Sequence, residues 1–398
     1  MRPDSPVLPP LHLQPLRWLA TTTTYAYYRT AYRVRGWGHI PKNTGPTLVI
    51  ANHQHEIESV VVVTALAFRQ RAWRAPVFTA SSRRMWEPGF LAGRLPWLAF
   101  VLAGMNFGWL FEAIGMQPIE NELRARPLGS LAYALHAAHG DLPLAEVFRE
   151  PALARIPPNL STLASALAPR NARAAGAYAT LSELRDPYRA ELLAATRVQL
   201  EADTLHFERL VDGGATLFLA PEGFYSGDGK LQRLRGLLPR LAPRAHVYLA
   251  GISYDPFVGR RLSLAYRLVA AEPELPLDVQ LLASRPVTTS ALLGTWLARA
   301  DAAPFALDEA VAAVRRARDA LPRPLFVVPE LRANAARMVS AALAGLVRLG
   351  TLRVENARYR VTAQRTHRHF PRSDDILAYQ ANFHAETLAG VRALETPS

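Results

Sequence analysis

The sequence predicts an α/β protein, in which a mostly parallel sheet is flanked by helices and a smaller α+β region follows at the C-terminus. The first observation is that three apolar runs end at turn residues, as buried strands do: GPTLVIAN at 45–52, ATLFLAPEGF at 215–224 and AHVYLAGISYD at 245–255. The second is that helical patterns lie between these runs, an alternation typical of parallel sheets. The third is size, because 398 residues, half of them hydrophobic, can bury a sizeable core and form two domains.

The charge balance favours an anionic partner. Lysine and arginine total 46 against 33 acidic residues, which gives a formal net charge of +13. Such a surface suits a membrane, nucleic acid, or a phosphorylated or CoA-like ligand, although a basic face that is merely solvated gives the same count. The chain has no cysteine, which excludes disulfides, thiolate nucleophiles and thiolate zinc sites.

The N-terminal segment, residues 1–33, is expected at a membrane interface. Residues 14–34 mix tryptophan, leucine and four tyrosines with arginines, which favours an amphipathic helix that lies either on a membrane or on the protein's own surface. The chain start lacks the apolar core of a signal peptide. Residues 95–111 are uncharged and strongly apolar, but Pro96, Gly104 and Gly108 favour a buried or monolayer-embedded helix over a crossing one. We therefore expect a peripheral or monotopic protein on the cytoplasmic face of the membrane.

The main domain is expected at 34–285, with a helical insertion at about 122–200 that is rich in alanine and interrupted by prolines. A helical pattern over 187–212 stops at two glycines, before the second strand. The C-terminal region, 286–398, contains an amphipathic helix at 307–321, then a second helix and two alternating strands that turn at 355–357. This order resembles a winged-helix module, although a helix and hairpin occur in many folds. The helix at 336–349 is mostly alanine and leucine, so we expect no specific nucleic acid partner.

A cluster of ionisable residues, Asn52-His53-Gln54-His55-Glu56-Ile57-Glu58, directly follows the first strand. Carboxylates in a first helical turn are favoured as caps, and the cluster lacks the HExxH spacing of a zinc site. A catalytic interpretation pairs His53 with Glu58. Five helical residues at about 100° each would put them on different faces, so His53 must lie in the turn before the helix. Glu58 could then accept the Nδ1–H and leave Nε2 as a general base. His55 and Glu56 are expected to support the pair.

A second polar segment, 217–237, places an acid and a glycine at the end of a buried strand, before a glycine-rich turn and several basic residues. Backbone N–H groups in such a turn and the cations beyond it suit an anionic group, although an ordinary strand-to-helix turn has the same pattern. The expected substrate-binding residues are Asn52, Glu222, Gly223, Phe224, Tyr225, Lys230, Arg233 and Arg235.

Together these motifs resemble the glycerolipid acyltransferase superfamily, which includes the 1-acylglycerol-3-phosphate acyltransferases. The family's NH-x4-D block is matched within RVRGWGHIPKNTGPTLVIANHQHEIE at 33–58, with Glu58 as the acid. Its second block is matched by GMQPIEN at 115–121, its PEG turn by residues 221–223, and its fourth, apolar block by VYLAGISYD at 247–255. The resemblance covers about 34–120 and 205–268.

The resemblance implies transfer of an acyl group from acyl-CoA or acyl carrier protein to a hydroxyl of a lyso-glycerolipid or related lipid. It implies His53 as general base, Glu58 as its orienting acid, an anionic membrane surface as partner, and no metal or other cofactor. Three positions depart from the family pattern. Glu58 replaces an aspartate, Asn121 stands where the second block usually ends in arginine, and Phe224-Tyr225 replaces Thr-Arg. Because those arginines are associated with the acceptor's phosphate, a less charged acceptor is expected.

Two other functions fit the same residues. A non-catalytic membrane or nucleic-acid adaptor could retain a degenerate acyltransferase core and use the basic C-terminal hairpin. A lipid acyl hydrolase would use the same histidine and acid with water as the acceptor.

Overall fold

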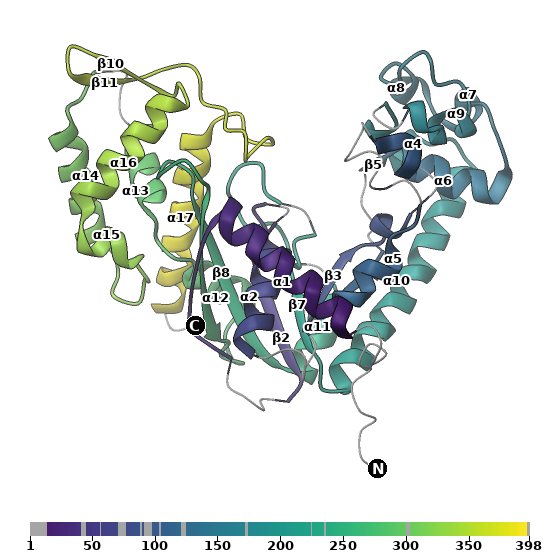
Figure 1. Cartoon of the computed structure of the whole chain (residues 1–398), viewed down its shortest axis with the longest axis horizontal. Coiled ribbons are helices and arrows are strands. Elements are labelled where there is room, and N and C mark those ends of the chain that lie inside the picture. Colours follow the sequence, from purple (N-terminus) through teal and green to yellow (C-terminus); the bar gives the residue numbers. More distant parts are fainter. Residues whose placement is uncertain are drawn as a thin grey trace. The chain divides into compact units, whose positions relative to one another are not determined.

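The structure is a computed structural model, and it describes residues 14–40, 45–55, 57–70, 77–87, 90, 98–102, 105–120, 125–171, 174–223, 225–234, 236–299 and 303–395. The chain divides into two compact units. The first contains Met1–Thr79 and Leu210–Ser398, and the second contains Ala80–Arg209. Figure 1 gives the element labels used below.

The strands form a seven-stranded sheet, and the predicted α/β class with a mostly parallel sheet is confirmed. Its strand order is β1 (Arg33–Trp37), β9 (Ser263–Ala270), β8 (His246–Asp255), β2 (Thr47–Ala51), β7 (Thr216–Leu219), β3 (Val77–Ser82) and β4 (Met116–Ile119). Strands β8, β2, β7 and β3 pair in parallel. Strand β9 is antiparallel to β8, and β1 is parallel to β9. All residues of β2 and β7 are buried, as expected for central strands covered on both faces.

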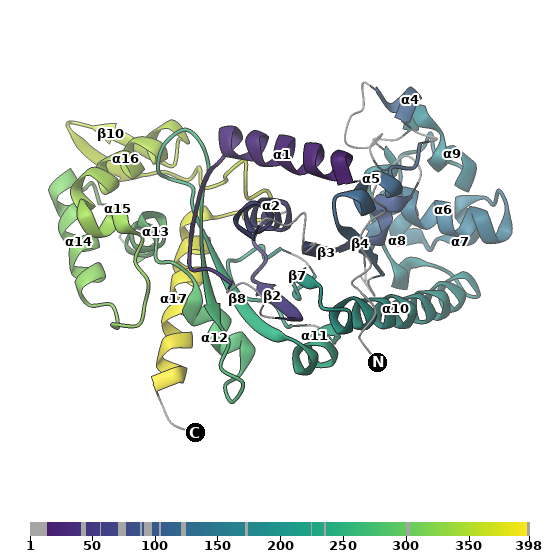
Figure 2. The same ribbon diagram turned by 60° about the horizontal axis from the view of Figure 1, so that its bottom comes forward.

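Helices cover the sheet of the first unit on both faces. Figure 2 shows α2 (Glu58–Gln70) and then α1 (Gln14–Ala31) on one face, and α11 (Leu237–Leu241) with α12 (Leu277–Ser284) on the other. The C-terminal helix α17 (Ile376–Glu395) packs along α12 and α13 (Thr289–Arg299) (Figure 1). One hydrophobic core joins the strands to α1, α2, α12, α13 and α17, so the C-terminal region belongs to the same compact unit as the sheet. The expected domain boundary near residue 285 stays a prediction.

Helix α1 forms despite its four threonines, and its side chains point two ways. Tyr25 and Tyr28 pack against the core of the first unit, whereas Trp18, Leu19 and Tyr27 are more than half exposed. Packing on α2 therefore accounts for one face of the helix, and large apolar groups remain on the other. Among the described residues, the helices lack the length and apolar character that a membrane crossing requires.

The predicted C-terminal helices and hairpin are present. They are α14 (Leu307–Asp319), α15 (Pro329–Ala333), α16 (Ala335–Arg348), β10 (Leu352–Glu355) and β11 (Arg358–Val361). The hairpin turns at Asn356 and Ala357, which both have positive φ. The resemblance to a winged helix is not confirmed. The hairpin's predicted basic character is reduced by ion pairs, because Arg353 and Arg360 lie near Glu355 and Arg358 pairs with Glu309.

The second unit has a small core of its own. Helices α6 (Leu128–His139), α7 (Leu144–Val147), α8 (Glu150–Leu153) and α9 (Leu163–Leu167) pack together, beside a short hairpin of β5 (Ala125–Pro127) and β6 (Tyr178–Thr180). The predicted helix at 187–212 is α10 (Tyr188–Asp212). In the apolar stretch at 95–111, the described part forms α4 (Ala99–Leu102) and the start of α5 (Gly108–Ala113), with Val101 and Trp109 exposed. The expected insertion at about 122–200 falls within this unit.

Candidate active site

Asn52 fixes the chain where it leaves β2. Its side-chain amide donates to the Ile252 carbonyl at 2.9 Å, and its Oδ1 accepts the Ile252 N–H at 2.7 Å. These two bonds continue the β2–β8 ladder beyond the Ala51–Ala250 pair. The Asn52 side chain is fully buried, so the structure places it beneath the turn, where it positions His53.

His53 and Glu58 are in contact across this turn. Helix α2 begins at Glu58, and the Glu58 Oε2 lies 2.7 Å from the His53 Nδ1. The other oxygen, Oε1, accepts the backbone N–H groups of Gln54 at 2.7 Å and His55 at 2.9 Å. The carboxylate therefore holds the whole turn that carries His53. With Nδ1 bound to Glu58, Nε2 is the ring nitrogen through which His53 can exchange a proton.

Burial and charge set the basicity of this pair. Burial lowers the pKa of His53, but the hydrogen bond to Glu58 and the Glu58 charge outweigh it, so the pKa lies above its ordinary value. Burial raises the pKa of Glu58, and the hydrogen bonds that its carboxylate accepts oppose that rise. A raised pKa makes His53 a stronger base, which suits proton transfer from a hydroxyl near neutral pH.

Glu222 connects the histidine turn to the loop that follows β7. Its Oε1 accepts the His53 backbone N–H, and its Oε2 accepts the Gln232 N–H at 2.6 Å. The residue is only 2% exposed, and burial raises the pKa of Glu222 to about 7 although the charge of Arg285 opposes the rise. A second hydrogen bond joins the same two segments, because the Ser226 N–H donates to the His53 carbonyl at 3.2 Å. Glu222, which was expected among the substrate-binding residues, therefore braces both turns.

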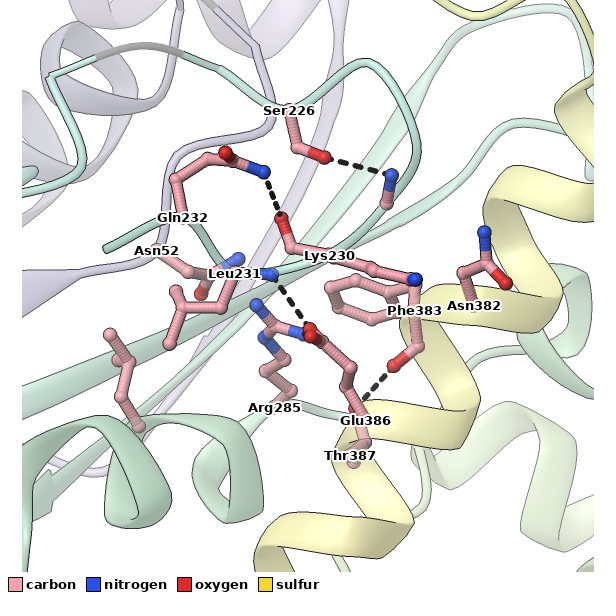
Figure 3. A network of polar contacts seen from close by, with 12 residues as sticks. Asn52, Ser226, Lys230, Leu231, Gln232, Arg285, Asn382, Phe383, Glu386 and Thr387 are labelled. Carbon is pink, nitrogen blue, oxygen red and sulfur yellow. Dashed lines mark hydrogen bonds and ion pairs between the residues drawn. The ribbon is translucent and has the colours of Figure 1, made fainter. Parts of the chain in front are cut away.

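The loop after β7 is held from below by α17. Figure 3 shows the Leu231 N–H donating to Glu386 Oε2, a bond of 2.7 Å, beside the buried guanidinium of Arg285. Arg285 Nη1 lies 3.4 Å from the same carboxylate oxygen, and its Cζ lies 4.4 Å from the centre of the Phe383 ring. Asn382 donates its side-chain N–H to the Asp228 carbonyl at 3.0 Å. None of these C-terminal contacts was expected from the sequence.

Gly229 allows the loop to lie directly on α17. Its φ is +85°, and an added Cβ would lie 2.2 Å from the Tyr379 carbonyl oxygen. A side chain at this position would be excluded both by the backbone conformation and by that contact. Gly223 also has a positive φ, of 71°, and its N–H donates to the Ala220 carbonyl in the turn that ends β7.

Aromatic and cationic side chains from distant parts of the chain surround the histidines. The Tyr225 ring lies edge-to-face with His53 at 5.7 Å between ring centres, and the Arg372 Cζ lies 4.3 Å from the Tyr225 ring centre. The His55 ring lies between 5.9 and 6.2 Å from the rings of Tyr254, His369 and Phe370. His55 thus packs against Tyr254 and the C-terminal segment, and the structure shows no contact between its ring and the His53–Glu58 pair among the ring contacts of the described residues.

Two of the remaining predicted residues, Lys230 and Arg233, lie in the loop after β7 and are exposed. Glu56, Phe224, Arg235 and Asn121 lie outside the described residues. Arg126, which follows the second block, donates to Glu120 at 2.8 Å within the second unit.

The part of the chain that the structure describes contains no group of three or more His, Asp or Glu side chains arranged to hold a metal ion. The chemistry that its residues offer is proton transfer by an oriented imidazole. Comparison with protein-family models and with curated proteins found no match to this chain.

Proposed function

We propose that this protein is an O-acyltransferase that moves a fatty acyl group from acyl-CoA or acyl carrier protein to a hydroxyl of a lyso-glycerolipid or related lipid. The observation that carries the proposal is the contact between His53 Nδ1 and Glu58 Oε2 at the carboxyl end of a parallel strand. Ligands of open α/β sheets bind at this edge. The order of the NH-x4-E and PEG motifs, which the resemblance rests on, supports the same reaction.

The reaction follows from the position of the imidazole. His53 Nε2 takes the proton of the acceptor hydroxyl while the oxygen attacks the thioester carbonyl, and Glu58 stabilises the imidazolium that forms. Collapse of the tetrahedral intermediate forms the ester and breaks the carbon–sulfur bond. The thiolate leaves and takes the proton from His53. Backbone N–H groups or a nearby side chain would hold the oxyanion.

Peripheral binding to an anionic membrane fits this function. The chain carries a net charge of +13, and α1 exposes Trp18, Leu19 and Tyr27. Aromatic and apolar side chains on an amphipathic helix bind at the lipid interface, and basic charge favours anionic lipids. We expect the protein to sediment with anionic liposomes, and a Trp18→Ser, Leu19→Ser variant to sediment less.

For the C-terminal region we propose a winged-helix arrangement. Helices α13, α14 and α16 and the hairpin β10–β11 follow one another in the order of that module. Support also comes from Phe305, which lies between α13 and α14 and pairs antiparallel with Tyr359 of β11. The hairpin arginines form ion pairs with Glu355 and Glu309, which reduces the positive charge that a nucleic acid would bind. We therefore propose that this region supports the core rather than binds a nucleic acid.

Comparative lipid mass spectrometry on the native host tests the acyltransferase. Deletion of the gene should leave a lipid class that lacks one acyl chain, and a wild-type copy should restore it. A His53→Gln copy should not. Restoration by that variant to the wild-type level would contradict the proposal.

A further inference from the structure

Tyr254 lies on the face of β8 that is directed toward α2. A Cβ on Gly251 of the same strand would lie 2.4 Å from Ser284 of α12, so Gly251 faces α12. Because side chains alternate along a strand, Tyr254, three positions further along, faces the opposite side, which α2 covers (Figure 2). Its ring centre lies 5.9 Å from that of His55, which is in the turn that leads into α2. Tyr254 therefore lies beside the turn that holds the proposed base.

The hydroxyl of Tyr254 is buried, and it forms no hydrogen bond of ordinary geometry among the described residues. The Tyr254 ring lies edge-to-face with Phe370, at 5.7 Å between ring centres, and the Tyr254 carbonyl accepts the Thr288 hydroxyl at 3.2 Å. The fold thus fixes both the backbone and the ring. Since an unpaired buried hydroxyl lowers stability, a small movement that brings it to an acceptor is favoured.

Glu58 offers that acceptor. Its Oε1 accepts the N–H groups of Gln54 and His55, and its Oε2 accepts from His53. Each carboxylate oxygen can accept two hydrogen bonds, so Oε2 has room for one more donor. Burial raises the pKa of Tyr254 most, and both the charge of Glu58 and hydrogen bonding to Glu58 raise it further. The Tyr254 hydroxyl is therefore within reach of the carboxylate.

The other ionisable groups near Tyr254 are weaker acceptors. Tyr379 of α17, and Tyr32, which follows α1, also raise the pKa of Tyr254 through their charge. His55 contacts the Tyr254 ring and donates its backbone N–H to Glu58. A carboxylate accepts a hydrogen bond more strongly than a phenol oxygen or an imidazole does. Glu58 is therefore the acceptor that the Tyr254 hydroxyl favours.

We propose that Tyr254 is a positioning residue, whose hydroxyl donates to Glu58 Oε2 and holds that oxygen against His53 Nδ1. The inference rests on the proposed acyltransferase function for the reaction that the pair performs. Within the sequence resemblance Tyr254 belongs to an apolar block, and no chemical role follows for it from that block. The hydroxyl also withdraws charge from the carboxylate, so the pair binds its proton less tightly than a pair without the hydroxyl would.

Tyr254→Phe tests the role, because it removes only the hydroxyl and keeps the ring against His55 and Phe370. With one donor fewer, the Glu58 charge stabilises the imidazolium more strongly, so the acid limb of kcat/KM should move up by about one pH unit. Because Oε2 is held less firmly, kcat at the pH optimum should fall about tenfold, with KM within about twofold of wild type. A packing defect would not move the limb upward. An unmoved limb, or one moved to lower pH, would overturn the proposal.

Tyr379→Phe is the matched control. Tyr379 is as buried as Tyr254, its hydroxyl also has no hydrogen-bond partner among the described residues, and its ring centre lies 5.1 Å from that of Phe370. Burial and the charge of Glu58 raise its pKa. The two variants thus lose the same group and differ in the bond to Glu58. Tyr379→Phe should leave the acid limb in place, and an equal upward shift in both variants would contradict the assignment.

A double variant asks whether Tyr254 acts through Glu58. Tyr254→Phe combined with Glu58→Gln should have the acid limb of Glu58→Gln alone, because the hydroxyl then has no carboxylate to act on. A further upward shift caused by Tyr254→Phe in that background would show that Tyr254 reaches His53 by another route, and the proposed bond would be wrong.

Titration of the imidazole without substrate separates this inference from the proposed function. In protein with isotope-labelled histidine, the NMR signals of His53 are those lost in His53→Gln, and their pH dependence gives the pKa of His53. That pKa should be about one pH unit higher in Tyr254→Phe than in wild type, and unchanged in Tyr379→Phe. If the pKa of His53 rises in this way but the wild type transfers no acyl group, only the acyltransferase proposal fails. If acyl transfer occurs and the pKa is the same in Tyr254→Phe, the positioning role is wrong.

Discussion

The two turns that meet at the candidate site are built in different ways. The turn after β2 is held mainly from within, because Glu58 accepts hydrogen bonds from His53, Gln54 and His55. The loop after β7 has hydrogen bonds of its own, such as Gly229 N–H to Ser226 Oγ, but it is also held by Glu386 and Asn382 of α17, more than 150 positions away in the chain. The first turn can therefore keep its geometry locally, whereas the second depends on the docked C-terminal helix.

Glu222 connects the turn after β2 to the loop after β7. It follows β7 in the chain but accepts the His53 N–H, so the loop after β7 also supports the base. Local contacts of Glu58 thus orient the imidazole. Long-range contacts of α17 shape the loop after β7, which would receive the substrate. Variants in the first turn should therefore act on the chemical step, and variants at α17 on loop order and substrate binding.

His53→Gln should have the largest effect on turnover. Glutamine cannot take a proton from a hydroxyl, so kcat should fall by about 10²–10⁴-fold. The backbone N–H that bonds to Glu222 is retained, so the thermal midpoint should change little. Acyl transfer assays and thermal melts measure the two effects, and a large fall in the midpoint would show that His53 is structural.

Glu58→Gln should lower kcat next most strongly, on the order of 10²-fold. The amide group facing Nδ1 would favour the tautomer with the proton on Nε2, which cannot accept the substrate proton. Loss of the Glu58 charge also lowers the pKa of His53, so the acid limb of the pH–rate profile should move to lower pH. If the acid limb of the pH–rate profile did not move, Glu58 would not be the group that sets the pKa of His53 during the reaction.

Glu222→Gln should reduce stability by about 1–3 kcal/mol, because a single amide oxygen cannot accept from both the His53 and the Gln232 N–H. It should also change the pH dependence. In the wild type the pKa of Glu222 is raised from 4.5 to about 7, so the folded state holds this proton more tightly than the unfolded chain. That stabilisation is present below pH 4.5 and is lost as pH rises through 7.

Urea unfolding at pH 5 and pH 8 measures this dependence. The stability lost between the two pH values should be smaller in Glu222→Gln than in the wild type, by up to about 3 kcal/mol. Equal losses in the two proteins would mean that Glu222 titrates normally.

Glu386→Gln should have the smallest effect on the chemical step. It removes the charge beside Arg285 and weakens the bond to the Leu231 N–H, at a cost of about 1–2 kcal/mol. Hydrogen exchange at the amides of residues 226–232 should accelerate, while kcat changes by only a few fold. Glu395→Gln, at the exposed end of the same helix, is the control and should alter neither. A fall in kcat as large as that of Glu58→Gln would contradict the division between the two turns.

The strands that carry the site were predictable because each is an apolar run that ends at turn residues. Strands β2, β7 and β8 were all identified in this way, as were α10 and α14. The antiparallel strand β9 and the helix α17 were missed. Strand β9 mixes Arg267 into an apolar run, and α17 has a weakly separated apolar face because it is covered by α12 and α13 on one side and the loop after β7 on another.

The site was predictable only where its contacts are local. The spacing of His53 and Glu58 in sequence indicated that they could meet, because five residues can close one turn. Nothing in the sequence spacing links Arg372 to Tyr225, or Glu386 to Leu231. Such pairs are set by how the C-terminal region docks on the sheet. The available signal was the conjunction of three arginines, two histidines and one phenylalanine at 365–372, which a solvated loop does not require.

The fate of a labelled acyl group tests the central claim most directly. Purified protein is incubated with acyl-CoA or acyl carrier protein labelled in the acyl chain, together with a mixture of lysolipid acceptors, and products are resolved by mass spectrometry. The acyltransferase predicts that the label appears in a new ester with wild-type protein, and that the rate falls about 10²–10⁴-fold in the folded His53→Gln variant. Label found only as free fatty acid, or ester formed by His53→Gln at the wild-type rate, would contradict it.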